Sequence, residues 1–117
     1  MNEDESLADR VRARTGVDTV TIMETAYSIT ALPADDPEVH HWTLHVKRFG
    51  ADRWSLGWGG RSWNFTTGEW QPTWGSPSVE DLCTDLDTAL ARAAVLAPVV
   101  SVNGKTAAQL LAWRAEQ

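Results

Sequence analysis

The sequence predicts an α+β fold: an antiparallel β-meander of about four to five strands, with C-terminal helices packed on its aromatic face and a short N-terminal helix. Apolar residues, most of them aromatic, alternate with polar ones through residues 40–66, which indicates half-buried strands. Beyond Pro77 the apolar spacing lengthens to the helical period. A length of 117 residues allows one domain, 1–117, rather than two.

The N-terminal helix is predicted over residues 6–15. Ser6 can cap it, Asp9 occupies the third helical position of a capping box, and Gly16 can end it. Few apolar residues line one side of this stretch, so a peripheral helix is expected.

One strand and one loop are predicted to lead from this helix into the meander. Residues 17–30 are rich in threonine and β-branched side chains, which favours a strand. The inward-facing positions change phase along it, which predicts a bulge near 24–26. Two prolines fix residues 31–38 as a loop.

The central strands are predicted over 40–48, 53–58 and 61–66, and short turns set their register. A three-residue turn after the first of them would place Val46 opposite Leu56. A two-residue glycine turn would then place Leu56 opposite Trp63.

The same turns predict two further aromatic pairs. Trp54 would lie opposite Phe65 across the glycine turn, and a turn at 67–68 would place Phe65 opposite Trp70. All the predicted registers put the aromatic side chains on one face, and a slip of one residue would move them to the other.

The C-terminal third is predicted to be helical. Residues 79–97 carry leucine and alanine at helical spacing, with either Ser78 or Asp85 as the N-cap and a firm helix from Leu86 to Pro98. After a turn at 103–104, a last helix over 105–116 offers an apolar face, which consists of Ala107, Leu110, Leu111 and Trp113.

From about residue 54 to 113 the chain resembles a group of small uncharacterised proteins from actinobacteria and their phages. The shared features are a tryptophan-containing hairpin ending in a TGEW turn, here 67–70, and a tail with DTAL, AP and VNG motifs, here 87–90, 97–98 and 102–104. The resemblance implies a phage or mobile-element origin and brings no activity with it.

Neither the histidines nor the cysteine predicts a reactive centre. His41 and His45 would share one strand face roughly 13 Å apart, too far to ligate one zinc ion together. Cys83 is flanked by Asp81 and Asp85, whose charges oppose thiolate formation, so a semi-buried apolar role is expected for it.

No pattern favours an enzyme or a cofactor. The glycines at 57–60 match neither the P-loop pattern nor the dinucleotide fingerprint and predict a hairpin turn. The acidic pairs 35–36 and 80–81 have no second group at catalytic spacing, and such charges are common in loops and at helix N-termini. The sequence predicts a non-enzymatic protein without metal or cofactor.

Seven tryptophans are the most unusual feature of the chain. Most are expected to fill the core between sheet and helices. Trp70 and Trp74, at the end of the meander, are the tryptophans expected to be exposed. With Arg53 and Arg61 they form a candidate interaction surface, because tryptophan and arginine are enriched at protein contacts.

The net charge of −6 arises in residues 1–38, which carry nine acids and three arginines. If the N-terminal helix and the loop lie close together, Asp35 and Asp36 complete an acidic patch. Such a patch would steer association with a basic or nucleic-acid-binding protein. The alternative is that these residues are ordinary solubilising charges.

These features predict a small cytoplasmic protein that binds another protein, such as a phage-encoded or accessory regulator or inhibitor of a host protein. The alternative is binding of single-stranded nucleic acid or carbohydrate through exposed tryptophans on the sheet. Duplex DNA is disfavoured because only residues 39–75 are mildly basic.

Three observations favour the cytoplasm. No apolar run is long enough for a membrane helix, and the N-terminus is unlike a signal peptide. A single cysteine fits a reducing compartment.

Overall fold

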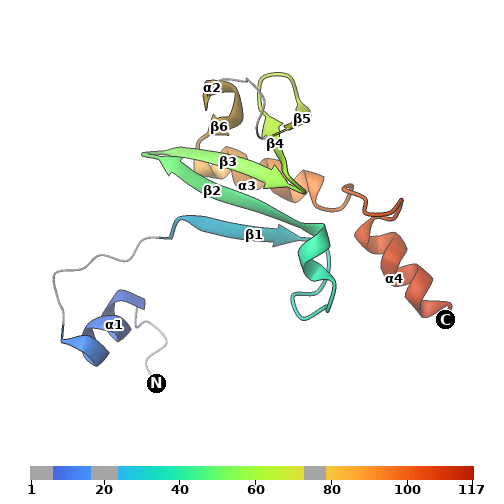
Figure 1. The fold of residues 1–117 in the computed structure, drawn as a ribbon, viewed down its shortest axis with the longest axis horizontal. Helices are drawn as coiled ribbons and strands as arrows, with labels where there is room; N and C mark the ends of the chain where they lie inside the picture. The colour runs from blue at the N-terminus through green and yellow to red at the C-terminus, as the bar shows by residue number, and fades with distance from the viewer. Residues whose placement is uncertain (1–6, 17–23, 73–78) are drawn as a thin grey trace.

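Figure 1 shows the computed structural model, which describes residues 7–16, 24–72 and 79–117. Its elements in chain order are α1 (Leu7–Thr15), β1 (Ala26–Thr30), the 3-10 helix η1 (Val39–Trp42), β2 (Thr43–Gly50), β3 (Arg53–Trp58), β4 (Arg61–Asn64), β5 (Glu69–Pro72), α2 (Val79–Leu82), β6 (Cys83–Thr84), α3 (Leu86–Leu96) and α4 (Ala107–Ala115). The predicted α+β class is confirmed.

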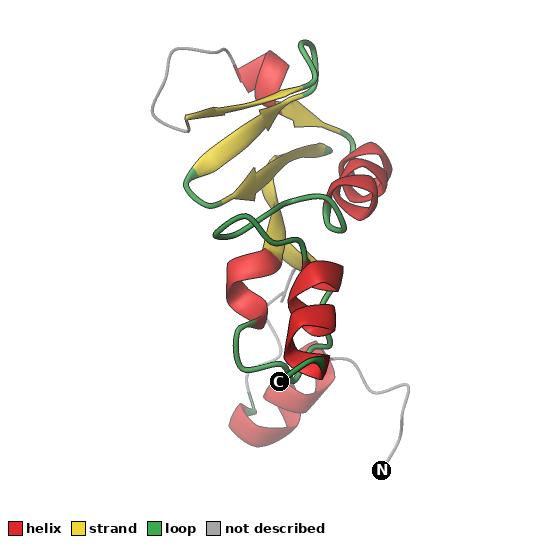
Figure 2. Cartoon of the chain, turned by 90° about the vertical axis from the view of Figure 1, so that its right-hand side faces the viewer, coloured by secondary structure: helices red, strands yellow, loops and turns green. Residues whose placement is uncertain are grey.

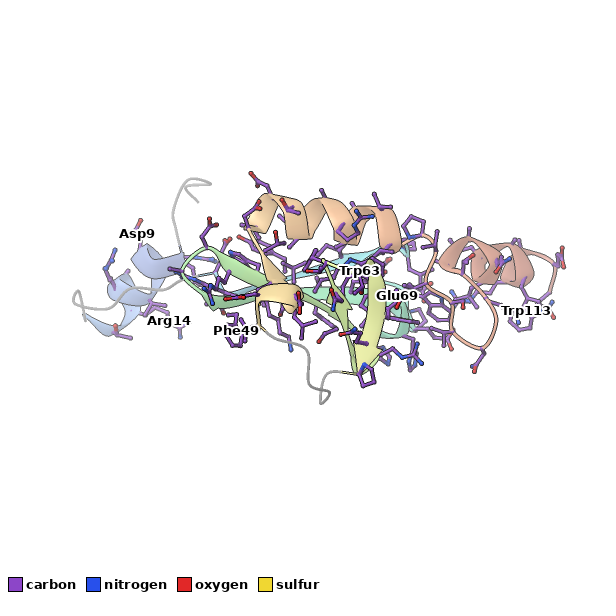
Figure 3. All side chains as sticks on the ribbon, turned by 90° about the horizontal axis from the view of Figure 1, so that it is seen from above. Asp9, Arg14, Phe49, Trp63, Glu69 and Trp113 are labelled. Atoms are coloured by element: carbon purple, nitrogen blue, oxygen red, sulfur yellow. The ribbon has the colours of Figure 1, made fainter. Side chains whose placement is uncertain are left out.

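The sheet is an antiparallel meander with one added strand. β1 to β5 lie side by side in chain order, and β6 pairs with β3. α3 packs along one face of the sheet, as two views show (Figures 2 and 3). Leu44, Val46 and Leu56 are fully buried at the centre of this two-layer core. The aromatic face of the meander is therefore covered by a helix, as predicted.

The first hairpin keeps its predicted register although its turn differs. Val46 lies opposite Leu56, as the alternation of both strands requires. The predicted three-residue turn is wrong, because Gly50 itself pairs with Arg53 and Phe49 becomes the extra residue of a bulge. The bulge absorbs one residue, so the pairing before it is unchanged.

The second hairpin forms around the glycines at 59–60, both at positive φ (57° and 77°), a conformation that glycine adopts without strain. Gly57 lies opposite Ser62, which is the register that a two-residue turn predicts. Leu56 and Trp63 are both buried, in agreement with that register. The predicted face of the aromatic residues is therefore confirmed.

β4 leaves β3 sooner than predicted, and β6 takes its place along the same strand. Trp54 lies opposite Thr84 of β6, so the predicted pairing of Trp54 with Phe65 is wrong. The side-chain oxygen of Asn64 accepts hydrogen bonds from the backbone N–H of Thr66 at 2.8 Å and of the next residue at 2.9 Å. These bonds compete with strand pairing and turn the chain at the end of β4.

The third hairpin differs from the prediction by two residues. Trp63 lies opposite Trp70, where Phe65 was expected. Residues 65–68 form the turn in place of 67–68. A shift of two residues conserves the strand face, so Trp70 still lies on the same side as Trp63.

β2 begins later than the predicted strand 40–48, because η1 takes up its first residues. The hydroxyl of Thr43 donates to the carbonyl oxygen of Val39 at 2.6 Å and closes this 3-10 turn. The prediction that His41 and His45 share one strand face is therefore wrong.

The single helix predicted over 79–97 is divided into α2, β6 and α3. Of the two predicted caps, Asp85 is confirmed: its side chain accepts from the backbone N–H of Thr88 at 3.0 Å, and α3 starts at Leu86. Pairing with β3 holds the preceding residues extended, which explains the break. Ser78 lies outside the described residues.

α4 does not cover the aromatic face, and the prediction that both C-terminal helices do so is wrong. A turn at 103–104, with φ of 53° and 79°, redirects the chain beyond the end of the sheet (Figure 1). Thr106 and Gln109 form a reciprocal capping box at its start. Ala107 and Leu110 are the residues of α4 that join the buried core.

The predicted N-terminal helix is confirmed over Leu7–Thr15, and the first predicted strand, 17–30, is confirmed over Ala26–Thr30 alone. α1 ends at Gly16, whose N–H donates to the carbonyl oxygen of Arg12 at 2.8 Å, and the helix lies apart from the sheet (Figure 1). The predicted cap Ser6 and residues 17–23 of the first predicted strand lie outside the described residues. Residues 24–26, where a bulge was predicted, are described: β1 begins at Ala26 and pairs with β2 in unbroken register from there. No described helix is long and apolar enough to cross a membrane.

Candidate functional site

Three of the tryptophans are core residues. Trp42, Trp54 and Trp63 expose 4%, 6% and 8% of their surface. The indole Nε1 of Trp42 donates to the carbonyl oxygen of Lys105 at 3.0 Å, which satisfies its polar atom and fastens the segment before α4. Arg92 of α3 lies over the Trp63 ring, 5.9 Å from its centroid. These three rings are therefore not available to a ligand.

Two further tryptophans are half-buried and pack together. The Trp70 ring lies 5.8 Å from that of Trp58 and 5.1 Å from that of Trp63, between centroids. The indole Nε1 of Trp58 donates to the carbonyl oxygen of His41 at 3.1 Å. Trp70 is thus less exposed than the sequence predicted, and Trp74 lies outside the described residues.

Trp113 on α4 is the exposed tryptophan that sequence reasoning missed. It exposes 49% of its surface, and Leu111 exposes 39%. The Nζ of Lys105 lies over its ring, 5.4 Å from the centroid. The exposed apolar residues of α4 are called the α4 surface, and they are Ala108, Leu111, Ala112, Trp113 and Ala115.

Helical geometry explains this exposure. Ala107 and Leu110 face the core, and at about 100° per residue Leu111 and Trp113 fall on opposite flanks of that face. The sequence signal was a helix that is apolar on nearly all sides, which is typical of a helix with contacts on more than one side.

Arg114 clamps α4 to the loop before η1. Its Nη1 lies 2.5 Å from Oδ2 of Asp36, and its Nη2 lies 2.7 Å from Oε2 of Glu38. The hydrogen bond from Arg114, reinforced by the backbone N–H of Glu38, lowers the pKa of Asp36. The two carboxylates in turn raise the pKa of Arg114. The forked guanidinium thus bridges two carboxylates and fixes the helix.

This clamp changes the interpretation of the acidic patch. The Asp36 side chain is 6% exposed and paired, whereas Asp35 is exposed. Asp9 of α1 and Trp113 of α4 lie at opposite ends of the molecule (Figure 3). α1 and the loop that binds α4 therefore do not combine into one acidic patch.

The histidines lie at one end of the sheet. His40 and His41 belong to η1, and their ring centroids are 4.0 Å apart. His45 lies on β2, opposite Gly57. Within 7–16, 24–72 and 79–117, no group of three or more His, Cys, Asp and Glu residues is placed to hold a metal ion.

Cys83 lies in β6, opposite Ser55, and is half-buried. Burial raises the pKa of its thiol, and the guanidinium of Arg53 lowers it by a smaller amount. Burial therefore suppresses the thiolate here, and not the charges of the flanking aspartates, as the sequence predicted.

Of the two cations of the predicted surface, Arg53 lies on the sheet face that α3 does not cover. This face is called the open face, and its residues on β1 to β4 are Ser28, His45, Lys47, Arg53, Ser55, Gly57 and Ser62. Arg61, at the start of β4, lies opposite Trp58, so its side chain is directed to the face that α3 covers. Trp70 also packs on the covered face, away from Arg53, so the predicted surface residues are not gathered in one place.

Two parts of the molecule thus present accessible chemistry: the α4 surface, which is apolar, and the open face, which is polar and cationic. Comparison of the chain with protein-family models, with curated proteins and with solved structures finds no match.

Proposed function

We propose that the protein acts without catalysis, by binding another protein through the α4 surface. The observation that carries this proposal is the exposure of Trp113 and Leu111 on a helix that buries only one of its apolar sides. Tryptophan is among the residues that contribute most to protein–protein affinity. Alanine neighbours allow a partner to approach the helix closely.

The fixed position of α4 supports the same function. Arg114 holds it by two carboxylates, and Trp42 binds the carbonyl of Lys105 just before it. A surface that is rigid before binding loses little conformational entropy on association. Glu38, half-exposed beside the clamp, and Glu116, which follows α4, favour a partner with basic groups around an apolar groove.

Protein binding is favoured over stacking of nucleic acid bases or sugars on the sheet. Such stacking needs accessible aromatic faces, and Trp54 and Trp63 are buried on the side of the sheet that α3 covers. The proposal includes a cytoplasmic location and, from the resemblance of residues 54–113, a regulator or inhibitor role in a phage or accessory context.

The test places a photo-crosslinking residue at position 111 in cells that express the protein, with position 49 as the control. Phe49 is also exposed, at 63%, but lies on the β2–β3 hairpin. A partner crosslinked only from position 111 is then purified and its affinity measured. Trp113→Ala should weaken binding at least about tenfold, as expected for a central interface tryptophan, and Phe49→Ala should leave it unchanged.

Two outcomes would contradict the proposal. One is that Trp113→Ala binds the partner as tightly as the wild type does. The other is that no partner protein is crosslinked from position 111 in cells that express the protein.

A further inference from the structure

β1 is a terminal strand of the sheet, and its outer side has no strand beside it in the described part of the chain (Figure 1). Its inner side pairs with β2 over Ala26–Thr30. A strand at the edge of a sheet presents a row of backbone N–H and C=O groups that can pair with another strand. The outer side of β1 is therefore a place where a further strand can add to the sheet.

The pairing of β1 with β2 shows which backbone groups point outward. The backbone N–H of Arg48 donates to the carbonyl oxygen of Thr25 at 2.7 Å. Every second residue of an antiparallel pair makes such bonds, so Tyr27 and Ile29 also bond to β2. The residues that alternate with them direct their N–H and C=O groups to the outer side, and they are Ala26, Ser28 and Thr30.

The two ends of the meander differ in how they are protected from further pairing. β5 carries Glu69 and Pro72, both exposed, and a charge or a proline keeps an edge strand from pairing. β1 has the sequence AYSIT, which contains no charge and no proline. Its tyrosine, isoleucine and threonine favour an extended strand. The β1 edge is therefore suited to pairing, whereas the β5 edge is not.

The side chains of β1 suit an antiparallel copy of the same strand. Tyr27 and Ile29 are half-buried and pack against the core on the face that α3 covers. If Ser28 lies opposite Ser28 of a second copy, Tyr27 of each copy lies opposite Ile29 of the other. Cross-strand pairs of an aromatic and a β-branched residue stabilise a sheet. Each copy would thus extend the apolar face of the other.

The two ends of β1 carry opposite charge. Lys47 and Arg48 of β2 lie beside its N-terminal end, where Glu24 offsets one of the two cations. Loop 31–38 follows its C-terminal end and holds three carboxylates, two of which share the guanidinium of Arg114. An antiparallel copy brings the basic end of each strand beside the acidic end of the other. Two-fold symmetry repeats this favourable contact.

We propose that the protein forms a dimer with a second copy of itself, in which the two β1 strands pair antiparallel about a two-fold axis at Ser28. Ser28 exchanges both backbone hydrogen bonds with its counterpart, and Ala26 does so with Thr30. The two meanders become one continuous sheet. This interface is separate from the α4 surface and does not depend on the protein-binding function. The paired strands are short, so the association is weak and reversible.

The test measures the mass of the full chain by analytical ultracentrifugation over a series of concentrations. The mass should rise from the 12.9 kDa of one chain toward twice that value. Ser28→Lys places two ammonium groups opposite each other at the axis and should raise the dissociation constant about tenfold or more. Ser101→Lys, the matched control, adds the same charge at an exposed position between α3 and α4 and should leave it unchanged.

A complementary variant separates lost pairing from lost folding. Ser28→Asp should also weaken self-association, because like charges again meet at the axis. An equimolar mixture of Ser28→Lys and Ser28→Asp should form a heterodimer, since unlike charges then face each other. Recovery in the mixture would show that both variants are folded and that residue 28 meets its own counterpart.

Nuclear magnetic resonance of mixed labelled and unlabelled chains tests the register. The Cα protons of Tyr27 and Ile29 should give an intermolecular Overhauser effect, because the Cα atoms of such a pair are about 4.5 Å apart. Within one strand the same two residues are roughly 6.6 Å apart along the chain, so the signal is specific to the dimer. The Ser28 amide should exchange with solvent more slowly as the protein concentration rises.

Three outcomes would overturn the proposal. A chain that stays monomeric at every concentration would leave the β1 edge to a strand of another protein. A dimer that Ser28→Lys does not weaken would have another interface, and dissociation by Trp113→Ala would place it at the α4 surface. A dimer without the contact between Tyr27 and Ile29 would have a different register.

Discussion

At the scale of single residues, Asp36 has the clearest structural role. It is an acid in a surface loop, yet its side chain is nearly covered and both of its oxygens accept from Arg114, 78 residues further along the chain. A lowered pKa follows from this pairing. Charge at this position therefore stabilises the fold as well as contributing to the acidity of the surface.

Acid should release α4 in a way that depends on Asp36. The pKa of Asp36 is lower in the folded state than in the unfolded state, so its contribution to stability is complete above the unfolded value of about 4. That contribution is lost as the pH falls through the lower folded pKa. Trp113 fluorescence, followed from pH 6 downward to roughly pH 2, should report this change in the wild type.

Asp36→Asn should remove most of this response, because the amide does not titrate there. Asp85→Asn is a control: Asp85 also has a lowered pKa, through the Thr88 backbone N–H, but it caps α3. An acid response of Trp113 fluorescence that is unchanged in Asp36→Asn would contradict the assigned role of the clamp.

The ionisation of Cys83 should respond to Arg53. Burial raises the pKa of the thiol and the guanidinium of Arg53 lowers it. Arg53→Gln should therefore raise the thiol pKa, measured by the ultraviolet absorbance of the thiolate during a pH titration. Arg48→Gln, on the other face of the sheet, should leave it unchanged, and a lower pKa in Arg53→Gln would contradict the proposed proximity.

At the scale of secondary-structure elements, side-chain caps decide where helices and strands stop. Asp85 starts α3, the Thr106–Gln109 box starts α4, and Asn64 ends β4 by accepting from the following backbone N–H groups. Each device satisfies backbone groups that would otherwise lose their partners at an element boundary. A helix cap depends on residues close in sequence, so the sequence could predict Asp85 as one of two possible N-caps.

Removal of the α4 cap should destabilise that helix. Thr106→Ala should lower the free energy of unfolding by about 0.5–2 kcal/mol, the usual cost of a lost N-cap. Thr106→Ser keeps the hydroxyl and should cost much less. Urea unfolding measures the free energy, and hydrogen exchange of the α4 amides shows whether the loss is local; equal stability of both variants and the wild type would contradict the capping role.

At the scale of the whole molecule, the two-layer core determines stability, and the α4 surface carries the proposed binding function. α3 seals one sheet face over Leu44, Val46 and Leu56, while the open face and the α4 surface remain outside this core. Changes in the core should therefore unfold the protein, and changes at the α4 surface should alter binding alone.

Leu56→Ala tests this division. The side chain is fully buried, so the truncation leaves a cavity and should lower the free energy of unfolding by about 2–5 kcal/mol. Val95→Ala on the outer side of α3, where the side chain is 61% exposed, should change stability by no more than about 0.5 kcal/mol. Urea unfolding of both variants measures the difference, and similar losses would show that the assigned core is wrong.

The local pattern of the sequence determined the fold class, the strand faces and several boundaries. Alternation placed Val46 opposite Leu56 and directed Trp54 and Trp63 to the buried side, because side-chain direction in a strand has a period of two residues. The predicted face of a side chain stays correct when a bulge offsets an error in turn length, as at Phe49. It also stays correct when the error shifts the pairing by two residues, as at Trp70.

Only the tertiary structure decided which segments meet over long separations. The replacement of β4 by β6 beside Trp54, the position of α4 beyond the sheet, and the pairing of Arg114 with Asp36 have no periodic signal, because each depends on where a distant segment is placed in space. The exposure of Trp113 follows from them. Periodicity specifies the face of a side chain, whereas its neighbours on that face are chosen by the packing of the whole chain.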